Sequence, residues 1–286
     1  LKTIALVLPK GNKLGRLQTG DVREFHMREF RMAKLVSTEV TDGILTITLD
    51  RASALNILNA KACFELSDIF DRFAEDDGQR VAIITGAGDK AFCAGHDLIE
   101  DFSEPMPETG WAGLSHRSGL NKPLIAAVNG FALGGGWELA MLCDVVVADP
   151  RASFGLPEPK VGFAALGGGA RLLPHRVPYH IAMGILLTGR SMSAADAARL
   201  GLVNEISAPG KVLETARKWA EDMLSCAPLA LQRSKQLAVA SANPASLRAP
   251  LQKMEIELTD ELIKSHDGQE GLAAFAERRA PVWTGQ

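Results

Sequence analysis

The sequence predicts an α/β fold in which a spiral of short strands and helices is followed by a helical C-terminal region. Two observations predict this class. As far as Pro178, short apolar segments bounded by glycine and proline alternate with helical patterns, which is typical of stacked βαβ-like turns around one core. After Pro178 the pattern is mostly helical, with candidate helices at residues 179–187, 194–200, 212–225, 229–240, 249–264 and 269–279.

The first half of the chain supplies the predicted strands. Residues 36–40 and 44–49 alternate apolar and polar side chains around Asp42-Gly43, a pair that a type I′ hairpin turn favours. A helix is expected to begin at Asn59 and to end near Asp77-Gly78. Further buried strands are expected at residues 81–85, 123–128 and 144–148.

Composition limits the possible partners. The chain has 286 residues, 47% hydrophobic and 23% charged, which suits one large domain with a real core. A net charge of −3 favours neither nucleic acid nor a membrane surface as a partner, and no apolar run is long enough to span a bilayer. The four cysteines lie far apart without a CxxC pair, so we expect no disulfide framework or zinc site and a cytoplasmic location.

We predict three parts along the chain. Residues 1–31 form an N-terminal extension outside the fold, residues 32–210 form the spiral core, and residues 211–286 form the helical C-terminal region. Within the core, residues 100–118 are rich in glycine, proline and charge, which predicts a mobile loop.

Two glycine-bearing loops carry the first chemical signal. Residues 91–98 follow a strand, and residues 129–138 follow another strand and open a helix with Gly134-Gly135-Gly136. Glycine lets the backbone approach a ligand closely, and the first N–H groups of a helix have no partner within it. Two such loops facing each other could hold an oxygen anion, which is what the enolate of a thioester requires.

A dinucleotide site is the competing interpretation of these glycines. Gly86 and Gly88 follow a strand, but a third glycine, a clear helix and an acid at the end of a second strand are all missing. No Gly-Lys-Ser or Gly-Lys-Thr follows either loop, so a P-loop is excluded.

Two acids complete the chemical pattern. Glu138 lies one turn inside the glycine-opened helix, and Glu158 follows residues 154–157 in a loop that could fold back towards it. Two carboxyls beside one cavity can divide acid and base roles when their environments separate their pKa values. A pair of glutamates alone is weak evidence, because most glutamates are solvated surface groups. We interpret Cys93 as a small buried hydrophobe and the Asp97 side chain as ordering its loop.

The blocks that carry these residues resemble the crotonase (enoyl-CoA hydratase) family. Residues 91–98, Ala-Phe-Cys-Ala-Gly-His-Asp-Leu, look like its A-F-[SCA]-A-G-x-D-L pattern. Residues 122–144 and 154–158 are similar to its second and third blocks, and the later residues 187–190, 194–197, 201–204 and 274–279 also fit its pattern. The resemblance runs in order from about residue 36 to the C-terminus, and it implies a crotonase-like ββα spiral.

The resemblance also implies roles for single residues. The backbone N–H groups of His96 and Gly135 would form the oxyanion hole. Glu138 and Glu158 would activate water and exchange the proton at C2, as in the hydratases that add water reversibly to a 2-enoyl-CoA. The residues along the coenzyme A path would be Ala94, His96, Asp97 and Leu98.

The same resemblance implies an acyl-CoA substrate whose coenzyme A is part of the substrate, with no separate cofactor and no metal. It also implies a homotrimer or homohexamer in which residues 211–286 serve trimerisation.

Departures from the usual family pattern concern the acyl group. Trp137 stands where a smaller residue is common, Pro159-Lys160 is an uncommon continuation, and residues 163–169 replace a Pro-Gly-Ala-Gly-Gly stretch. These changes look like branches that act on carnitine-type, aromatic or other specialised acyl groups. A carnitinyl-CoA dehydratase, an enoyl-CoA isomerase using Glu158 alone, and a non-catalytic acyl-CoA-binding protein stay open as alternatives.

Overall fold

The computed structural model describes residues 35–99, 103–226, 228–242, 256, 260 and 263–282. The predicted extension at residues 1–31 and most of the predicted helix at 249–264 lie outside the described residues. The described chain is mixed α/β and contains two sheets, so the predicted α/β class is confirmed.

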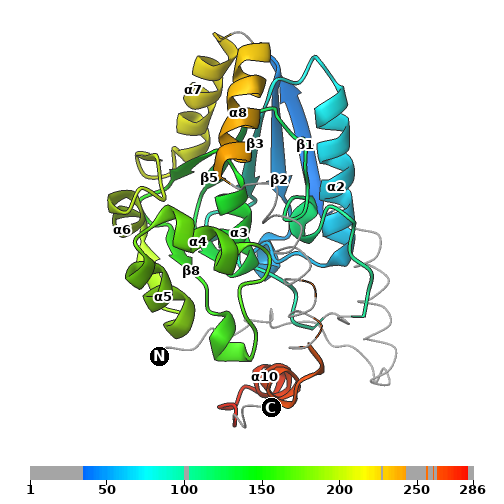
Figure 1. Ribbon diagram of the computed structural model, residues 1–286, viewed down its shortest axis with the longest axis vertical. Helices are drawn as coiled ribbons and strands as arrows, with labels where there is room; N and C mark the ends of the chain where they lie inside the picture. The colour runs from blue at the N-terminus through cyan, green and yellow to red at the C-terminus, as the bar shows by residue number, and fades with distance from the viewer. Residues whose placement is uncertain are drawn as a thin grey trace, which may run out of the picture. The chain divides into compact units, whose positions relative to one another are not determined.

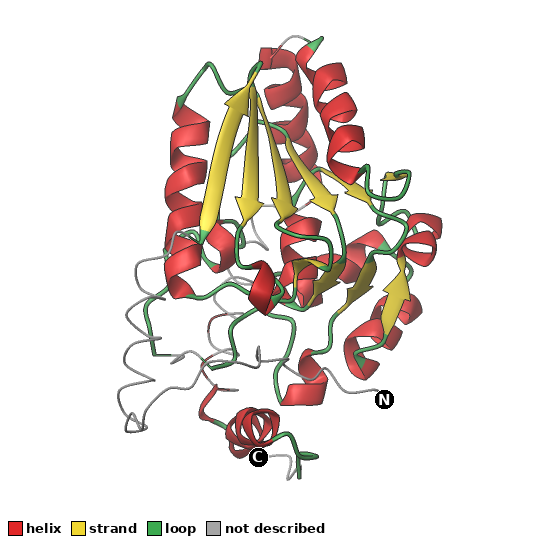
Figure 2. Ribbon diagram, turned by 180° about the vertical axis from the view of Figure 1, so that it is seen from behind, coloured by secondary structure: helices red, strands yellow, loops and turns green. Residues whose placement is uncertain are grey.

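The larger sheet has six strands in the order β1-β2-β3-β5-β7-β10 (Figure 2). Their bounds are Val36–Thr41, Ile44–Leu49, Val81–Gly86, Leu124–Val128, Val145–Ala148 and Glu205–Ile206. Strands β1 and β2 form the expected antiparallel hairpin, and the other neighbours pair in parallel. Both turn residues have positive φ, 53° at Asp42 and 81° at Gly43, as the predicted type I′ turn requires.

Helices cover both faces of this sheet (Figure 1). Ile84 of β3 packs in one core cluster with Phe70 of α2 (Ala60–Glu75), while the neighbouring Ile83 packs in another with Ala216 of α7 (Val212–Leu224). A strand buried on both faces needs apolar side chains at nearly every position, which is why β3, β5 and β7 lack the alternation that β1 shows. Helix α2 begins as predicted, because the Asn59 side chain accepts the N–H of Ala62.

The second sheet has four very short strands in the order β4-β6-β8-β9. Their bounds are Ala91–Cys93, Phe131–Leu133, Ser153–Gly155 and Ser191–Ser193. The first three pair in parallel, and β9 runs antiparallel to β8. The prediction of plain loops at residues 91–98 and 129–136 was wrong in this respect, since a strand of three residues is too short to show a period.

The other described elements are helical. The α-helices are α3 (Gly135–Leu142), α4 (Gly169–Arg176), α5 (Tyr179–Thr188), α6 (Ala194–Arg199), α8 (Pro228–Ala242) and α10 (His266–Glu277). In Figure 1 α8 lies beside α7 in the upper part of the view, while α4 and α5 lie lower. The 3₁₀ turns are η1 (Ala52–Ala54), η2 (Trp111–Gly113) and η3 (Glu158–Val161). Within the described residues no helix has the length and apolar content needed to cross a membrane.

Helix α4 is absent from the sequence-based prediction. Three glycines lead into it at residues 167–169, and Pro174 lies inside it. Both residue types disfavour helix, so local propensity alone points to a loop. The helix is instead stabilised by packing, because Leu173 is fully buried in the main core cluster.

Candidate active site

The second sheet brings the predicted site residues together. Parallel strands end at the same edge of a sheet, and each of β4, β6 and β8 is followed by one chemical segment. Residues 94–97 follow β4, the start of α3 follows β6, and Glu158 follows β8 after two residues. Three segments that are separated by about forty and twenty residues in sequence therefore meet at one edge.

Glycine is required where the two loops meet. A Cβ added to Gly95 would lie 3.3 Å from the Gly135 nitrogen and 3.1 Å from the Leu133 carbonyl oxygen. A Cβ added to Gly136 would overlap the carbonyl oxygen of Cys93. The two glycine-bearing loops thus face each other in direct backbone contact.

The backbone of the first loop has a defined direction. His96 forms an isolated parallel bridge with Leu58, in which the Leu58 N–H donates to the Gly95 oxygen at 2.9 Å. The Asp97 N–H donates back to the Leu58 oxygen, also at 2.9 Å. In a parallel bridge only one of the two residues uses its own N–H and C=O in the hydrogen bonds, and here that residue is Leu58. The other residue, His96, directs its N–H and C=O to the opposite side. The His96 N–H therefore lies on the face turned away from Leu58.

The second loop contributes a helix N-terminus. Helix α3 begins at Gly135, directly after Gly134 with a positive φ of 55°. The N–H groups of the first turn have no acceptor within the helix, and the helix dipole adds partial positive charge there. Donors at this place can stabilise an oxygen that gains negative charge during a reaction.

Side chains near the first loop have neutral or structural roles. The Asp97 carboxylate accepts from Arg51 Nη1 at 2.7 Å and from the Ile99 N–H at 3.2 Å, so it orders the loop. Burial lowers the pKa of His96 to about 4, against the opposing charge of Asp97, and leaves the imidazole neutral at pH 7. Burial raises the pKa of Cys93 to about 12, which suits a packed thiol and not a nucleophile.

Glu138 is a fixed acceptor. Its side chain on α3 is buried, with only 4% exposed, and Oε1 accepts the N–H of Gly169 at 2.8 Å. A Cβ added to Gly167 would lie 2.7 Å from the other carboxylate oxygen. The glycines at 167–169, which looked like an acyl-specific departure, therefore pass directly over this carboxyl group and hold it.

Glu158 has the opposite environment. It opens η3, and both of its carboxyl oxygens are buried without a hydrogen-bond partner among the described residues. Burial raises the pKa of Glu158 to about 7. A Cβ on Gly134 would lie 3.1 Å from Glu158 Oε1, so this carboxyl lies against the glycine turn that opens α3. Two carboxyls in unlike environments beside one turn are suited to separate acid and base roles.

Trp111 is the site residue that the sequence did not reveal. Its indole Nε1–H donates to the Gly135 oxygen at 3.1 Å, and its ring centre lies 5.2 Å from that of His96. Trp137, which drew attention in the sequence, is 1% exposed and packs in the core, 5.9 Å from Phe154 between ring centres. No sequence signal separates the two tryptophans, because their difference is one of tertiary contact.

The contacts with coenzyme A are the remaining roles that the sequence predicts. Ala94 and Leu98 are partly buried residues of the first loop, and their contacts with coenzyme A stay a prediction, together with those of His96 and Asp97. Across the part of the chain that the structure describes, no three His, Cys, Asp or Glu side chains cluster as metal ligands would.

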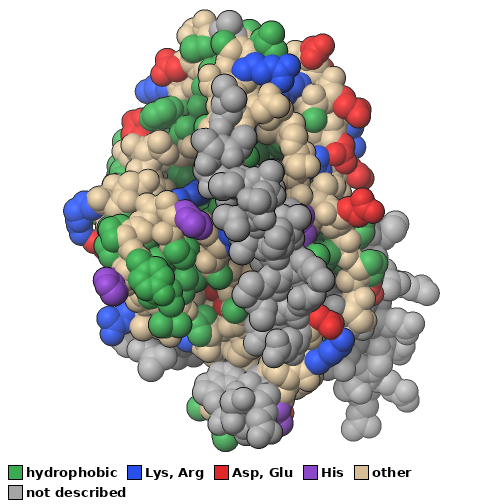
Figure 3. Space-filling view, in the orientation of Figure 1, with side chains coloured by type: hydrophobic (Ala, Val, Ile, Leu, Met, Phe, Trp, Pro, Cys, Tyr) green, Lys and Arg blue, Asp and Glu red, His purple; other side chains and the backbone are tan. Residues whose placement is uncertain are grey.

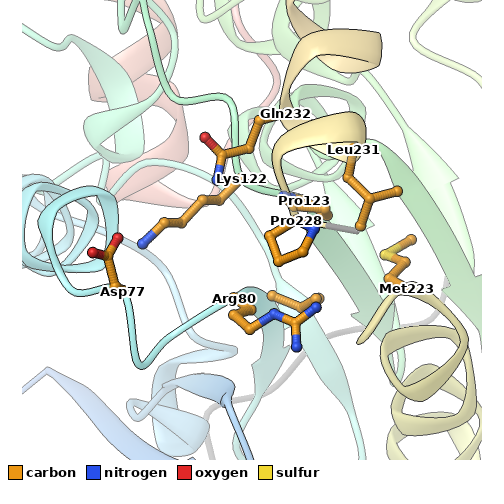
Figure 4. Close-up of a pocket in the computed structure, with 9 residues that line it drawn as sticks. Asp77, Arg80, Lys122, Pro123, Met223, Pro228, Leu231 and Gln232 are labelled. Atoms are coloured by element: carbon orange, nitrogen blue, oxygen red, sulfur yellow. The ribbon is translucent and has the colours of Figure 1, made fainter. Parts of the chain in front are cut away.

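A cavity of about 220 Å³ lies elsewhere (Figure 4). Arg80 and Pro123 line it at the beginnings of β3 and β5, and Leu231 of α8 closes it. The Arg80 guanidinium donates to the carbonyl oxygens of Leu224 and Cys226, both at 3.0 Å. The cavity is therefore at the amino ends of the parallel strands, whereas the candidate site follows carboxyl ends.

The family model for enoyl-CoA hydratase/isomerase matches residues 39–286. The chain belongs to this family, and the predicted crotonase-like fold is confirmed.

Similar proteins carry related names. A carnitinyl-CoA dehydratase from Proteus mirabilis (strain HI4320) is 38% identical over 263 residues, covering 89% of this chain and all of the relative. The Escherichia coli (strain K12) carnitinyl-CoA dehydratase is 40% identical over 251 residues, covering 85% of this chain and 96% of its own. The crystal structure of a carnitinyl-CoA hydratase from Mycobacterium avium has a TM-score of 0.82 at 40% identity, with 89% of this chain and 100% of that chain covered.

Proposed function

We propose that this protein catalyses the reversible addition of water to a 2-enoyl-CoA, and that its acyl group is of the carnitinyl type. The observation that carries the proposal is the pair Glu138 and Glu158, one hydrogen-bonded at 2.8 Å and the other buried without a partner among the described residues. The acyl group rests on the relatives, which are named carnitinyl-CoA dehydratases at 38–40% identity.

The environments assign a role to each carboxyl. Below about pH 7 Glu158 carries a proton, which it gives to C2 of the enoyl group. Glu138, held by the Gly169 N–H, takes a proton from the water that attacks C3. The developing enolate oxygen accepts from the N–H groups of His96 and Gly135. In the reverse direction the same groups exchange roles and release water from a 3-hydroxyacyl-CoA.

The test is a turnover screen with the purified protein. Its substrates are carnitinyl-CoA, the enoyl-CoA that forms when it loses water, and unsubstituted short, long and aromatic 2-enoyl-CoA esters. We expect water addition or loss with at least one pair, and fastest with the carnitinyl pair. Silence across the whole panel with acyl-CoA still bound would favour a non-catalytic binding protein.

Variants of the two glutamates test the mechanism. Glu138→Gln and Glu158→Gln are each expected to lower kcat by roughly 10²–10⁴-fold while acyl-CoA still binds, because each removes one proton transfer. Glu214→Gln is the matched control, since Glu214 pairs with Lys211 on the outside of α7 at 2.9 Å and is expected to be silent. Double-bond migration that persists in Glu138→Gln would favour an isomerase that uses Glu158 alone.

The pH dependence tests the proton that the two glutamates share. Hydration needs protonated Glu158, so its kcat should fall as pH rises above about 7. Dehydration needs the same single proton, now on Glu138 with Glu158 ionised, so its kcat should fall over the same range. A kcat for hydration that rises or stays level above about pH 7 would contradict the acid role of Glu158.

A homotrimer or homohexamer is also part of the proposal. Figure 3 shows hydrophobic side chains gathered where α5 lies in Figure 1, and Tyr179 and Leu187 on this helix are 62% and 70% exposed. Apolar patches of this kind often mark contacts between subunits. Light scattering in solution tests the assembly, and a monomer would contradict it.

A further inference from the structure

A strained turn holds Trp111 at the candidate site. Around it the backbone is left-handed at Gly110, Ala112 and Gly113, with φ of 74°, 52° and 68°. Ala112 has a Cβ, so this conformation costs it on the order of 1 kcal/mol or more. Strain of this kind persists only where the surrounding structure imposes it.

Helix α2 imposes this conformation. The Ala112 N–H donates to Cys63 Sγ at 3.4 Å, and Arg117 donates to the Ser67 carbonyl oxygen at 2.9 Å. Arg117 also pairs with Asp71 at 2.6 Å. Ala112 and Arg117 belong to residues 100–118, for which the sequence predicts a mobile loop. In the structure their turn is instead tied to α2, a helix of the main core. Trp111 is therefore positioned by contacts of its turn with α2.

The Trp111 indole lies where three segments of the site converge. A Cβ on Gly135 would lie 2.5 Å from Cζ2 of the indole, so the ring is in close contact with the second glycine loop. A Cβ on Gly167 would lie 3.1 Å from Cδ1 and 2.7 Å from Glu138 Oε2. The His96 ring meets the indole edge to face at 5.2 Å. The two glycine-bearing loops and residues 167–169, which pass over Glu138, thus all border the Trp111 side chain.

This position bears on the acyl chain. If the thioester oxygen lies at the His96 and Gly135 N–H groups and C3 lies at Glu138, the atoms beyond C3 begin next to the indole. We propose that Trp111 is the specificity-determining residue of this site, walling the acyl pocket so that short acyl groups are accepted and long straight chains are excluded. The inference rests on the proposed function.

The experiment compares kcat/KM for a four-carbon and a ten-carbon trans-2-enoyl-CoA. Wild type should prefer the short substrate, and Trp111→Ala should shift the ratio towards the long one by about tenfold or more. Trp111→Phe keeps a ring without the N–H and should retain the wild-type preference. Trp219→Phe removes a similar indole hydrogen bond on α7, to Glu205 at 2.7 Å, and should leave the ratio unchanged.

An unchanged ratio in Trp111→Ala would overturn the inference, and so would an equal loss with both substrates. A Trp111→Phe variant that behaves like Trp111→Ala would assign the effect to the indole hydrogen bond. It would also overturn the proposal that the Trp111 ring walls the acyl pocket. Calorimetric binding of the saturated four-carbon and ten-carbon acyl-CoA esters to the same variants gives a ratio that needs no turnover. If the protein turns over no substrate but Trp111→Ala shifts the binding ratio towards the ten-carbon ester, the proposed function is contradicted. The role of Trp111 as a wall of the acyl pocket then still holds.

Discussion

The two sheets of this protein differ in strand length and in what surrounds them. Strands β1, β2 and β3 of the large sheet are six residues long, and helices bury both of its faces. The strands of the small sheet have three residues each, yet their ends carry residues 94–97, the start of α3 and Glu158. The comparison teaches that the large sheet forms the interior between two layers of helices, whereas the small sheet sets the positions of the chemical groups.

The largest expected effect separates stability from geometry. Phe73 of α2 is fully buried in the main core cluster, so Phe73→Ala should lower the free energy of unfolding by about 3–5 kcal/mol. Chemical denaturation measures this loss. The kcat of the molecules that remain folded should be unchanged, because Phe73 belongs to the core under the large sheet. A fall in kcat per folded molecule would contradict the conclusion that the small sheet, and not the core under the large sheet, positions the chemical groups.

A glycine of the small sheet's edge gives the converse test. A Cβ on Gly136 would overlap the Cys93 carbonyl oxygen, so Gly136→Ala must push the two loops apart. A displacement of this kind costs roughly 10²-fold in kcat/KM. Gly184→Ala is the matched control, since nothing lies within 4 Å of the added Cβ on α5, and it should gain about 0.4–1 kcal/mol of stability with full activity. Equal activity in both variants would contradict the role given to the loop contact.

The stability of the protein should depend on the ionisation of Glu158. The folded pKa of about 7 exceeds the ordinary value of 4.5, so the folded state binds the proton more tightly than the unfolded state. The stabilisation is therefore fully present below about pH 4.5 and is lost as the pH rises towards 7, by roughly 3 kcal/mol at most.

Glu158→Gln cannot ionise and should remove this slope. Denaturation at pH 5 and pH 8 should then show the variant gaining on wild type at the higher pH. A variant that loses stability relative to wild type between these two pH values would show that Glu158 has a partner when charged.

The smallest effect concerns a helix cap outside the site. Asn59 caps α2 by accepting the Ala62 N–H at 3.0 Å, and Asn59→Ala should cost about 1 kcal/mol of stability. Thermal unfolding measures it, and Asn59→Ser should restore most of the loss. Helix α2 also anchors the turn that carries Trp111. A change in substrate preference in Asn59→Ala would therefore show that α2, which covers the large sheet, also affects the candidate site at the small sheet.

Local pattern was enough for much of the fold. The hairpin at Asp42-Gly43 and the cap at Asn59 depend on a few adjacent residues, and the structure has them where the sequence predicts them. The runs at 81–85 and 123–128 were recognisable because a strand buried on both faces is apolar throughout. Strands of three residues and a helix led by glycines lie below what such patterns can detect.

The candidate site divides in the same way. The residue types and order of its segments, including Gly95, Gly135, Glu138 and Glu158, are present in the sequence and carry the family resemblance. The catalytic and coenzyme A roles drawn from that resemblance stay predictions until the variants are measured.

By itself the sequence determined the α/β class, the family and the spacing of the loops, because these are recorded in neighbouring residues. Only the tertiary structure decided that Trp111 borders the site while Trp137 packs in the core. It also decided that Glu138 is held by Gly169, which is 31 residues away, while Glu158 is buried and its pKa raised to about 7. The physical reason is that burial and hydrogen bonding depend on which distant segments meet, and local propensity carries no record of that meeting.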